Sequence, residues 1–180
     1  MSNKIGQNCI DLAKRSESLH DGDLSKIDCQ PKRDPVGIWT VGYGHAIFYQ
    51  DGTGIKNFED VKKLYPQYLN ITIEQAEQLL SEDMSKLEPS INKILPNLNQ
   101  NQFDAIADFC FNMGFSRFKG STLLKRIIAQ SPDYMITDAF LMWNKGDING
   151  DGVLEMLPGL TYRRKSEALL YNKGVLQFFN

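Results

Sequence analysis

The residues that favour β-strands are gathered in one short stretch, and this distribution limits the fold more than any other feature of the sequence. Residues 36–48, VGIWTVGYGHAIF, are rich in β-branched and aromatic side chains and are interrupted by glycines, which is typical of short strands joined by turns. Helical spacing of apolar residues precedes this stretch and fills the chain after it. The sequence therefore predicts an α+β fold, with a small β-rich lobe at about residues 17–58 and a larger helical lobe at about 59–180 plus the N-terminal helix.

The predicted helices carry recognisable start signals. Residues 4–16 form the first helix, with Ile5, Cys9, Leu12 and Ala13 on one face. Residues 17–33 lose that spacing and contain turn-forming residues, which indicates irregular structure. Later helices are predicted to start at a Thr72–Gln75 capping box, at an Asn99 cap with the helix ending near Gly114, and at a Ser/Thr cap at 121–122. The segments 133–143 and 158–171 complete the set of predicted helices.

Length and charge exclude several classes of protein. A chain of 180 residues with 42% hydrophobic content suits one domain spanning 1–180, and the crevice between its two lobes is the natural ligand site. A net charge of −2 provides no basic field for nucleic acid. No apolar run is long enough for a signal peptide or a membrane span, so we expect a soluble protein made in the cytoplasm.

The three cysteines predict neither a disulfide framework nor a zinc site. Cys9, Cys29 and Cys110 are odd in number and widely spaced. Cys9 and Cys110 lie in apolar helical patterns, so we expect both to be buried thiols.

Two carboxylates and a threonine stand at positions suited to hydrolysis of a glycosidic bond. Glu17 lies at the end of the first predicted helix, Asp34 opens the glycine-rich hairpin, and Thr40 follows six residues later. One carboxylic acid must protonate the leaving oxygen, while the other stays ionised to activate water or stabilise a cationic centre. The chain has 22 acidic residues, so residue type alone does not select this pair.

The complete string DPVGIWTVGYGHA resembles the hairpin motif of bacteriophage-type lysozymes, the endolysins and muramidases of glycoside hydrolase family twenty-four. In that family a Glu at the end of the first helix precedes an Asp, five residues, a Thr and a Gly-Tyr-Gly-His-like run. Two further segments are similar to the family's central helix with the helix after it, and to its Gly-Leu-x-x-Arg-Arg helix: NQNQFDAIADFCFNMGFSRFKGSTLL and PGLTYRRKSEALLY.

The resemblance implies a lysozyme-like fold with a catalytic cleft between its lobes. It implies cleavage of β-1,4 bonds between N-acetylmuramic acid and N-acetylglucosamine in bacterial peptidoglycan, by a monomer that needs no cofactor or metal and acts on the cell wall after release. Glu17 becomes the general acid, Asp34 the second carboxylate and Thr40 the hydroxyl that helps to hold the water.

The resemblance also implies residues outside the catalytic trio. Phe111, Asn112 and Ser121 would line the saccharide site, although core packing, a helix end and a helix cap explain them equally well. The family's histidine after the glycines pairs with an Asp on the first helix beyond the β-lobe. The corresponding pair here is His45 with Asp83, and we expect a structural ion pair.

The sequence departs from the family between the two carboxylates. Sixteen residues separate Glu17 from Asp34 where the family has eight, and the shorter spacing would end on Lys26. The segment HDGDLSKIDC therefore contains an insertion, and Asp21, Asp23 and Asp28 remain rivals of Asp34. The distance from Asp34 to Thr40 and GYGH favours Asp34.

Other segments have alternative interpretations. DINGDG at 147–152 resembles the start of a calcium loop, but position twelve is Pro158 instead of Glu, so a turn-rich loop is the simpler interpretation, with Glu155 as a further oxygen ligand if an ion binds. Arg163 and Arg164 could bind an anionic peptide stem or pair with Glu167 on the same helix.

Three alternative functions fit the same scaffold. A lytic transglycosylase would leave an anhydro-sugar, a chitinase-like enzyme would accept glycans without peptide, and a glycan-binding module would have no activity.

Overall fold

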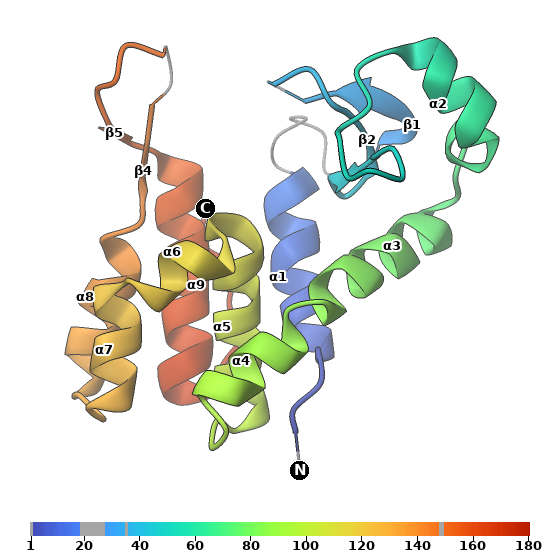
Figure 1. The fold of residues 1–180 in the computed structure, drawn as a ribbon. Helices are drawn as coiled ribbons and strands as arrows, with labels where there is room; N and C mark the ends of the chain where they lie inside the picture. Colours follow the sequence, from blue (N-terminus) through green and yellow to red (C-terminus); the bar gives the residue numbers. More distant parts are fainter. Residues whose placement is uncertain (1, 19–27, 35, 148–149) are drawn as a thin grey trace. The chain divides into compact units, whose positions relative to one another are not determined.

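The computed structural model describes residues 2–18, 28–34, 36–147 and 150–180 (Figure 1). The chain divides into two compact units, one of Met1–Ser16 with Met84–Asn180 and the other of Glu17–Asp83. The unit that contains the predicted β-rich segment 17–58 continues to Asp83. Helices dominate and the strands form small antiparallel sheets, so the predicted α+β class is confirmed.

The sheet of the Glu17–Asp83 unit has three antiparallel strands, β1 (Asp28–Arg33), β2 (Trp39–Gly42) and β3 (His45–Ala46), in that order. The hairpin predicted within 36–48 is present as β2 and β3. The prediction of irregular structure is wrong for β1, whose sequence DCQPKR has no alternating apolar pattern and contains a proline. It forms a strand because it lies at the sheet edge, where β2 supplies its hydrogen bonds and proline is tolerated.

The core of this unit lies under the hairpin and the segment that follows it. Ile47, Ile55 and Val61 are buried. The last of them belongs to α2 (Phe58–Leu64), which precedes a short 3₁₀ helix, η2 (Pro66–Tyr68). Partly buried side chains cover this core: Trp39, Tyr49, Phe58, Tyr65, Tyr68 and Leu69.

Helix α3 (Ile73–Ser85) starts at the predicted capping box. The Gln75 N–H donates to Thr72 Oγ1 at 3.2 Å, and the Thr72 N–H donates to Gln75 Oε1 at 2.8 Å. The backbone of β2 approaches α3 closely, because a Cβ placed on Gly42 would lie only 2.9 Å from Ala76 Cβ. This close approach positions the hairpin against the helix.

Helix α5 (Gln100–Met113) is the centre of the other unit. Every residue from Phe103 to Cys110 is buried, so this helix has no solvent-facing side over that span. The predicted Asn99 cap is confirmed and forms a complete capping box with Gln102. Helix α9 (Pro158–Lys173) packs against α5 and against α8 (Asp133–Leu141) (Figure 1).

The remaining helices are short except for α1 (Gln7–Ser18). Cys9, Leu12 and Ala13 of α1 are buried as predicted, whereas Ile5 precedes the helix. The others are α4 (Glu88–Ile94), α6 (Phe115–Lys119) and α7 (Thr122–Ile128). No helix in the described ranges is long and apolar enough to cross a lipid bilayer.

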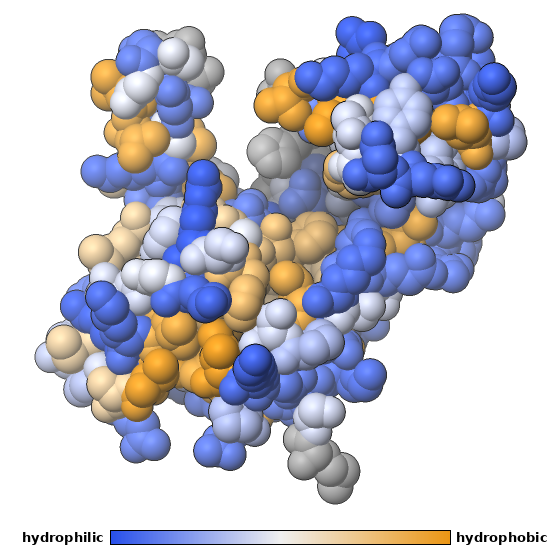
Figure 2. Space-filling view, in the orientation of Figure 1, coloured by the Kyte–Doolittle hydropathy of each residue, from blue (hydrophilic) through white to orange (hydrophobic). Residues whose placement is uncertain are grey.

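A second small hairpin connects α8 to α9, with strands β4 (Lys145–Gly146) and β5 (Glu155–Met156). The exposed side chains of Val153, Leu154 and Met156 give this arm apolar surface, orange in Figure 2. The sequence predicts only a turn-rich loop here, because neither strand exceeds two residues.

Candidate active site

Asp34 lies in the turn that joins β1 to β2, and its carboxylate helps to build that turn. Asp34 Oδ1 accepts the N–H groups of Val36 at 3.0 Å and Ile38 at 2.8 Å. The Asp34 N–H donates to the Ile38 carbonyl at 2.8 Å. Among the residues that the structure describes, none bonds the second oxygen, Oδ2. One oxygen is therefore held by the backbone, and the other can accept a hydrogen bond from water or substrate.

Thr40 lies in β2, opposite Lys32 of β1. Its hydroxyl donates to the Lys32 carbonyl at 3.3 Å, and the residue is 8% exposed. Because its proton is used in this bond, the hydroxyl oxygen keeps lone pairs that can accept another hydrogen bond.

Glu17 lies in the last turn of α1 and is partly buried. Its carboxylate is beside the turn between β2 and β3, since a Cβ placed on Gly44 would lie 3.8 Å from Glu17 Oε2. The structure thus brings the helix-borne carboxyl next to the GYGH segment within one compact unit.

His45 and Asp83 are in contact. His45 Nδ1 lies 2.7 Å from Asp83 Oδ2, and the two side chains are 19% and 22% exposed. The edge of the Tyr68 ring also contacts the His45 ring, with 5.4 Å between centroids. This contact joins β3 to α3, and neither side chain lies on the turn that faces Glu17.

The expected saccharide-binding residues belong to the helical unit. Phe111 and Asn112 are partly buried in the last turn of α5, where Asn112 Oδ1 accepts a hydrogen bond from Arg164 Nη2 at 2.7 Å. Ser121 Oγ accepts the Leu124 N–H at 3.0 Å and caps α7. With 4% of Ser121 exposed, the structure favours the cap over a surface for sugars.

Some rivals lie outside the described residues. Asp21, Asp23 and the neighbouring His20 lie in the segment 19–27, outside the described residues. The side chains of Asp28 and Cys29 are not described either. The preference for Asp34 therefore continues to rest on its spacing to Thr40 and on its place in the hairpin.

The sequence predicts only part of a buried ionic cluster in the helical unit. Arg163 and Arg164 approach Glu167, at 3.7 and 3.0 Å, as expected for one helix face. Asp108 of α5, which was not predicted, binds Arg163 through two hydrogen bonds of 2.9 and 2.7 Å. An acid in the middle of an apolar helix is the signal that could have revealed it, because buried carboxylates need partners.

Burial dominates the ionisation of this cluster and of the nearby thiols. It raises the pKa of Glu167 despite the nearby Arg164 guanidinium, and it lowers the pKa of Arg164. Burial also raises the pKa of Cys9 and of Cys110, both free and buried as predicted. The two thiols thus stay protonated and are poor nucleophiles.

In the described part of the 147–152 segment, two aspartates accept hydrogen bonds from backbone N–H groups. The two oxygens of Asp147 accept the N–H groups of Gly150 and Gly152, at 2.8 and 3.0 Å, and Asp151 Oδ1 accepts that of Val153 at 2.8 Å. These carboxylates are occupied by the backbone. Within the described ranges no group of three or more His, Cys, Asp or Glu side chains could hold a metal.

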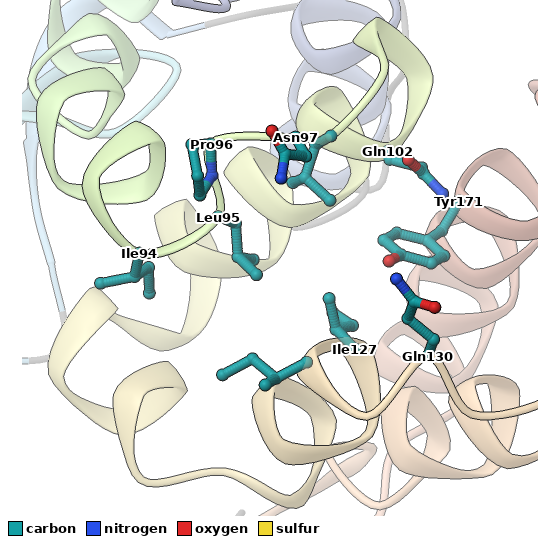
Figure 3. Close-up of a pocket in the computed structure, with 10 residues that line it drawn as sticks. Ile94, Leu95, Pro96, Asn97, Gln102, Ile127, Gln130 and Tyr171 are labelled. Atoms are coloured by element: carbon teal, nitrogen blue, oxygen red, sulfur yellow. The ribbon is translucent and has the colours of Figure 1, made fainter.

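A pocket of about 300 Å³ lies in the helical unit, between the α4–α5 connection, α7 and α9 (Figure 3). Its walls are apolar side chains, three amides and Tyr171, whose pKa burial raises to about 12. No lining side chain is a carboxylic acid, so this pocket cannot supply acid catalysis. Its lining is Ile94, Leu95, Pro96, Asn97, Leu98, Gln102, Ile127, Ile128, Gln130 and Tyr171.

Known proteins resemble this chain over nearly its whole length. Residues 25–167 match the family model for phage lysozyme. The endolysin of Acyrthosiphon pisum secondary endosymbiont phage 1 is 37% identical over 172 residues, 94% of this chain and 99% of that protein.

Two solved structures have the same fold. The endolysin from Escherichia coli O157:H7 phage FAHEc1 has a TM-score of 0.74 at 28% identity, covering 98% of this chain and 99% of that one. The muramidase domain of SpmX from Asticaccaulis excentricus has a TM-score of 0.71 at 28% identity, covering 94% and 97%. Because the family match spans most of the chain and these proteins align almost from end to end, this chain belongs to the phage lysozyme family.

Proposed function

We propose that the chain hydrolyses peptidoglycan with Glu17 as general acid, Asp34 as second carboxylate and Thr40 as water-binding hydroxyl. Membership of the phage lysozyme family makes the chain a glycoside hydrolase of the bacterial cell wall. The bond cleaved is the β-1,4 link from N-acetylmuramic acid to N-acetylglucosamine. The observation that carries the residue assignment is the position of Glu17 Oε2 beside Gly44, at 3.8 Å from its Cβ position.

The family match begins at residue 25 and does not include Glu17, so the role of Glu17 rests on its position in the structure. A carboxyl at a helix end, partly shielded from water by a hairpin, can deliver its proton to a bound glycosidic oxygen. Any side chain at position 44 would start 3.8 Å from the Glu17 Oε2 atom, so glycine keeps this side of the carboxyl clear of a neighbouring side chain.

Asp34 and Thr40 each keep an acceptor that can bind water. Asp34 Oδ1 is occupied by two N–H groups and the Thr40 proton by a carbonyl, so Asp34 Oδ2 and Thr40 Oγ1 remain as acceptors. In the proposed reaction these acceptors hold the water that attacks the sugar. This arrangement requires no metal or cofactor.

We expect a monomer whose partner is the cell wall, without a role in binding nucleic acid, because the net charge is −2. The His45–Asp83 contact has a structural role in this scheme, holding β3 on α3.

Mass spectrometry of digested peptidoglycan tests the reaction. Hydrolysis leaves products with free reducing ends. Exclusively anhydro-muramic products would instead identify a lytic transglycosylase, digestion of chitin alone a chitinase-like enzyme, and binding without products a glycan-binding module.

Substitution tests the residues. Glu17→Gln keeps size and polarity but removes the transferable proton, so we expect turnover to fall about 10²–10⁴-fold with unchanged thermal stability. Asp34→Asn should remove most activity, while Asn at Asp21, Asp23 or Asp28 should be tolerated. An active Asp34→Asn beside an inactive Asp28→Asn would move the second carboxylate to position 28.

A further inference from the structure

The side-chain amide of Asn112 is held in one orientation by a buried arginine. Asn112 Oδ1 accepts a hydrogen bond from Arg164 Nη2 at 2.7 Å, across 52 residues of sequence. Rotating the amide by half a turn would put its NH₂ group against the guanidinium, donor against donor. The NH₂ end is therefore directed away from Arg164.

The arginine itself cannot move easily. Arg164 is fully buried, and Glu167 Oε1 lies 3.0 Å from its Nη2. Its guanidinium carbon lies 4.7 Å from the centroid of the Phe109 ring. Next to it on α9, Arg163 is fixed by two hydrogen bonds to Asp108. Rigid neighbours on α5 and α9 thus set the position of the guanidinium.

Stability alone does not explain why Arg164 is buried. Buried ionic groups can often be replaced by apolar ones without loss of stability. Nevertheless Arg164 leaves Nε and Nη1 without hydrogen bonds, and within the described residues its one hydrogen bond goes to Asn112. Beside the ion pair with Glu167, the described residues thus give this guanidinium the bond to Asn112.

The NH₂ group of Asn112 remains available for a ligand. Asn112 is partly exposed in the last turn of α5, next to the partly exposed Phe111. In the described part of the chain no acceptor bonds Nδ2. An oriented and partly exposed amide donor can bond the hydroxyl or acetamido oxygens that a sugar presents.

We propose that Arg164 is a positioning residue that holds the Asn112 amide as a donor to a hydroxyl or acetamido oxygen of the glycan. The inference rests on the proposed function, because it takes the glycan as the ligand. Arg164 touches no substrate and acts only through Asn112.

Asn112→Asp separates this role from a structural one. The carboxylate keeps the size of the side chain and still accepts from Arg164, but it has no N–H to donate. If Asn112 has only a structural role, this variant should be stable and its kinetics should be unchanged. We expect instead an unchanged melting temperature, a KM for solubilised peptidoglycan raised about 2- to 10-fold, and a kcat within about twofold of wild type. Asn112→Ala, which adds no charge, should raise KM to a similar extent.

Asn101→Asp is the matched control. Asn101 lies on the same helix, and its Oδ1 accepts from Asn8 Nδ2 at 3.0 Å, so the same substitution keeps an acceptor and adds the same charge. Its KM should equal that of wild type. A wild-type KM in Asn112→Asp would overturn the proposal.

Arg164→Lys tests whether the arginine acts through Asn112. We expect it to raise KM in the wild-type background and to have no further effect on KM in Asn112→Ala. An equal increase in both backgrounds would show that Arg164 acts by another route. If Arg164→Lys does not fold, the KM of Asn112→Asp compared with that of Asn101→Asp decides whether the Asn112 amide donates a hydrogen bond to the glycan.

These results remain distinct from failure of the proposed function. Wild-type protein that releases no reducing ends from peptidoglycan would refute the function itself. Active wild-type protein with an unaffected Asn112→Asp would refute only the positioning role.

Discussion

At the residue scale, two glycines of the Glu17–Asp83 unit show how the stability cost of a left-handed backbone differs from the cost of a steric clash. Gly42 has a φ of +63° and a Cβ position 2.9 Å from Ala76 Cβ, whereas Gly37 has a φ of +86° and no described atom within 4 Å of its Cβ position. Alanine at Gly37 should cost only the left-handed conformation, about 1–2 kcal/mol. Alanine at Gly42 should cost about 1–3 kcal/mol more, because it also pushes β2 away from α3. Urea unfolding of both variants measures the difference, and equal losses would show that the hairpin accommodates the extra methyl group.

At the element scale, α9 carries both a buried and an exposed ion pair. The Arg163 and Asp108 side chains are 3% and 0% exposed, while those of Lys173 and Asp133 are 61% and 55% exposed. Asp108→Asn removes the buried carboxylate that accepts two hydrogen bonds from Arg163, so we expect a loss of about 3–5 kcal/mol in the free energy of unfolding. Lys173→Gln breaks only a solvated pair and should cost less than about 1 kcal/mol. Denaturation midpoints compare the two, and similar losses would mean that the buried cluster does not anchor α9 on α5.

At the scale of the whole molecule, side chains from 88–104 bind the N-terminal segment. The N–H groups of Asn3, Ile5 and Gly6 donate to Asn92, Glu88 and Asp104 at 2.9, 2.8 and 2.8 Å. Burial outweighs these bonds at Asp104 and raises its pKa. An acid with a raised pKa binds more protons in the folded chain, so its contribution to stability is full below the ordinary carboxyl pKa. That contribution is lost as pH rises through the raised value.

Asp104→Asn removes this titration while keeping an acceptor for Gly6. We therefore expect the difference in free energy of unfolding, variant minus wild type, to shift in favour of the variant as pH rises through that window. Urea denaturation at a series of pH values gives this difference. If it is constant across the window, Asp104 does not contribute to the pH dependence.

The sequence alone determined the elements whose signals are local. The Thr72–Gln75 capping box and the Asn99 cap lie next to the helices they start, and each bonds as predicted. The glycine-rich hairpin and the Asp34 to Thr40 spacing are equally local, since one turn and one strand contain them. Short-range hydrogen bonds and side-chain periodicity explain why these features could be predicted.

Tertiary structure alone decided the features whose partners are distant in the chain. DCQPKR becomes β1 only because β2 provides a ladder, and Asp108 finds Arg163 fifty-five residues away. The contact of Glu17 with the Gly44 turn likewise joins a helix end to a hairpin across the segment 19–27. The orientation of the Asn112 amide depends on an arginine of α9. In each case the deciding energy is the desolvation or hydrogen bonding of a group whose partner is set by packing, and no local pattern in the sequence specifies that partner.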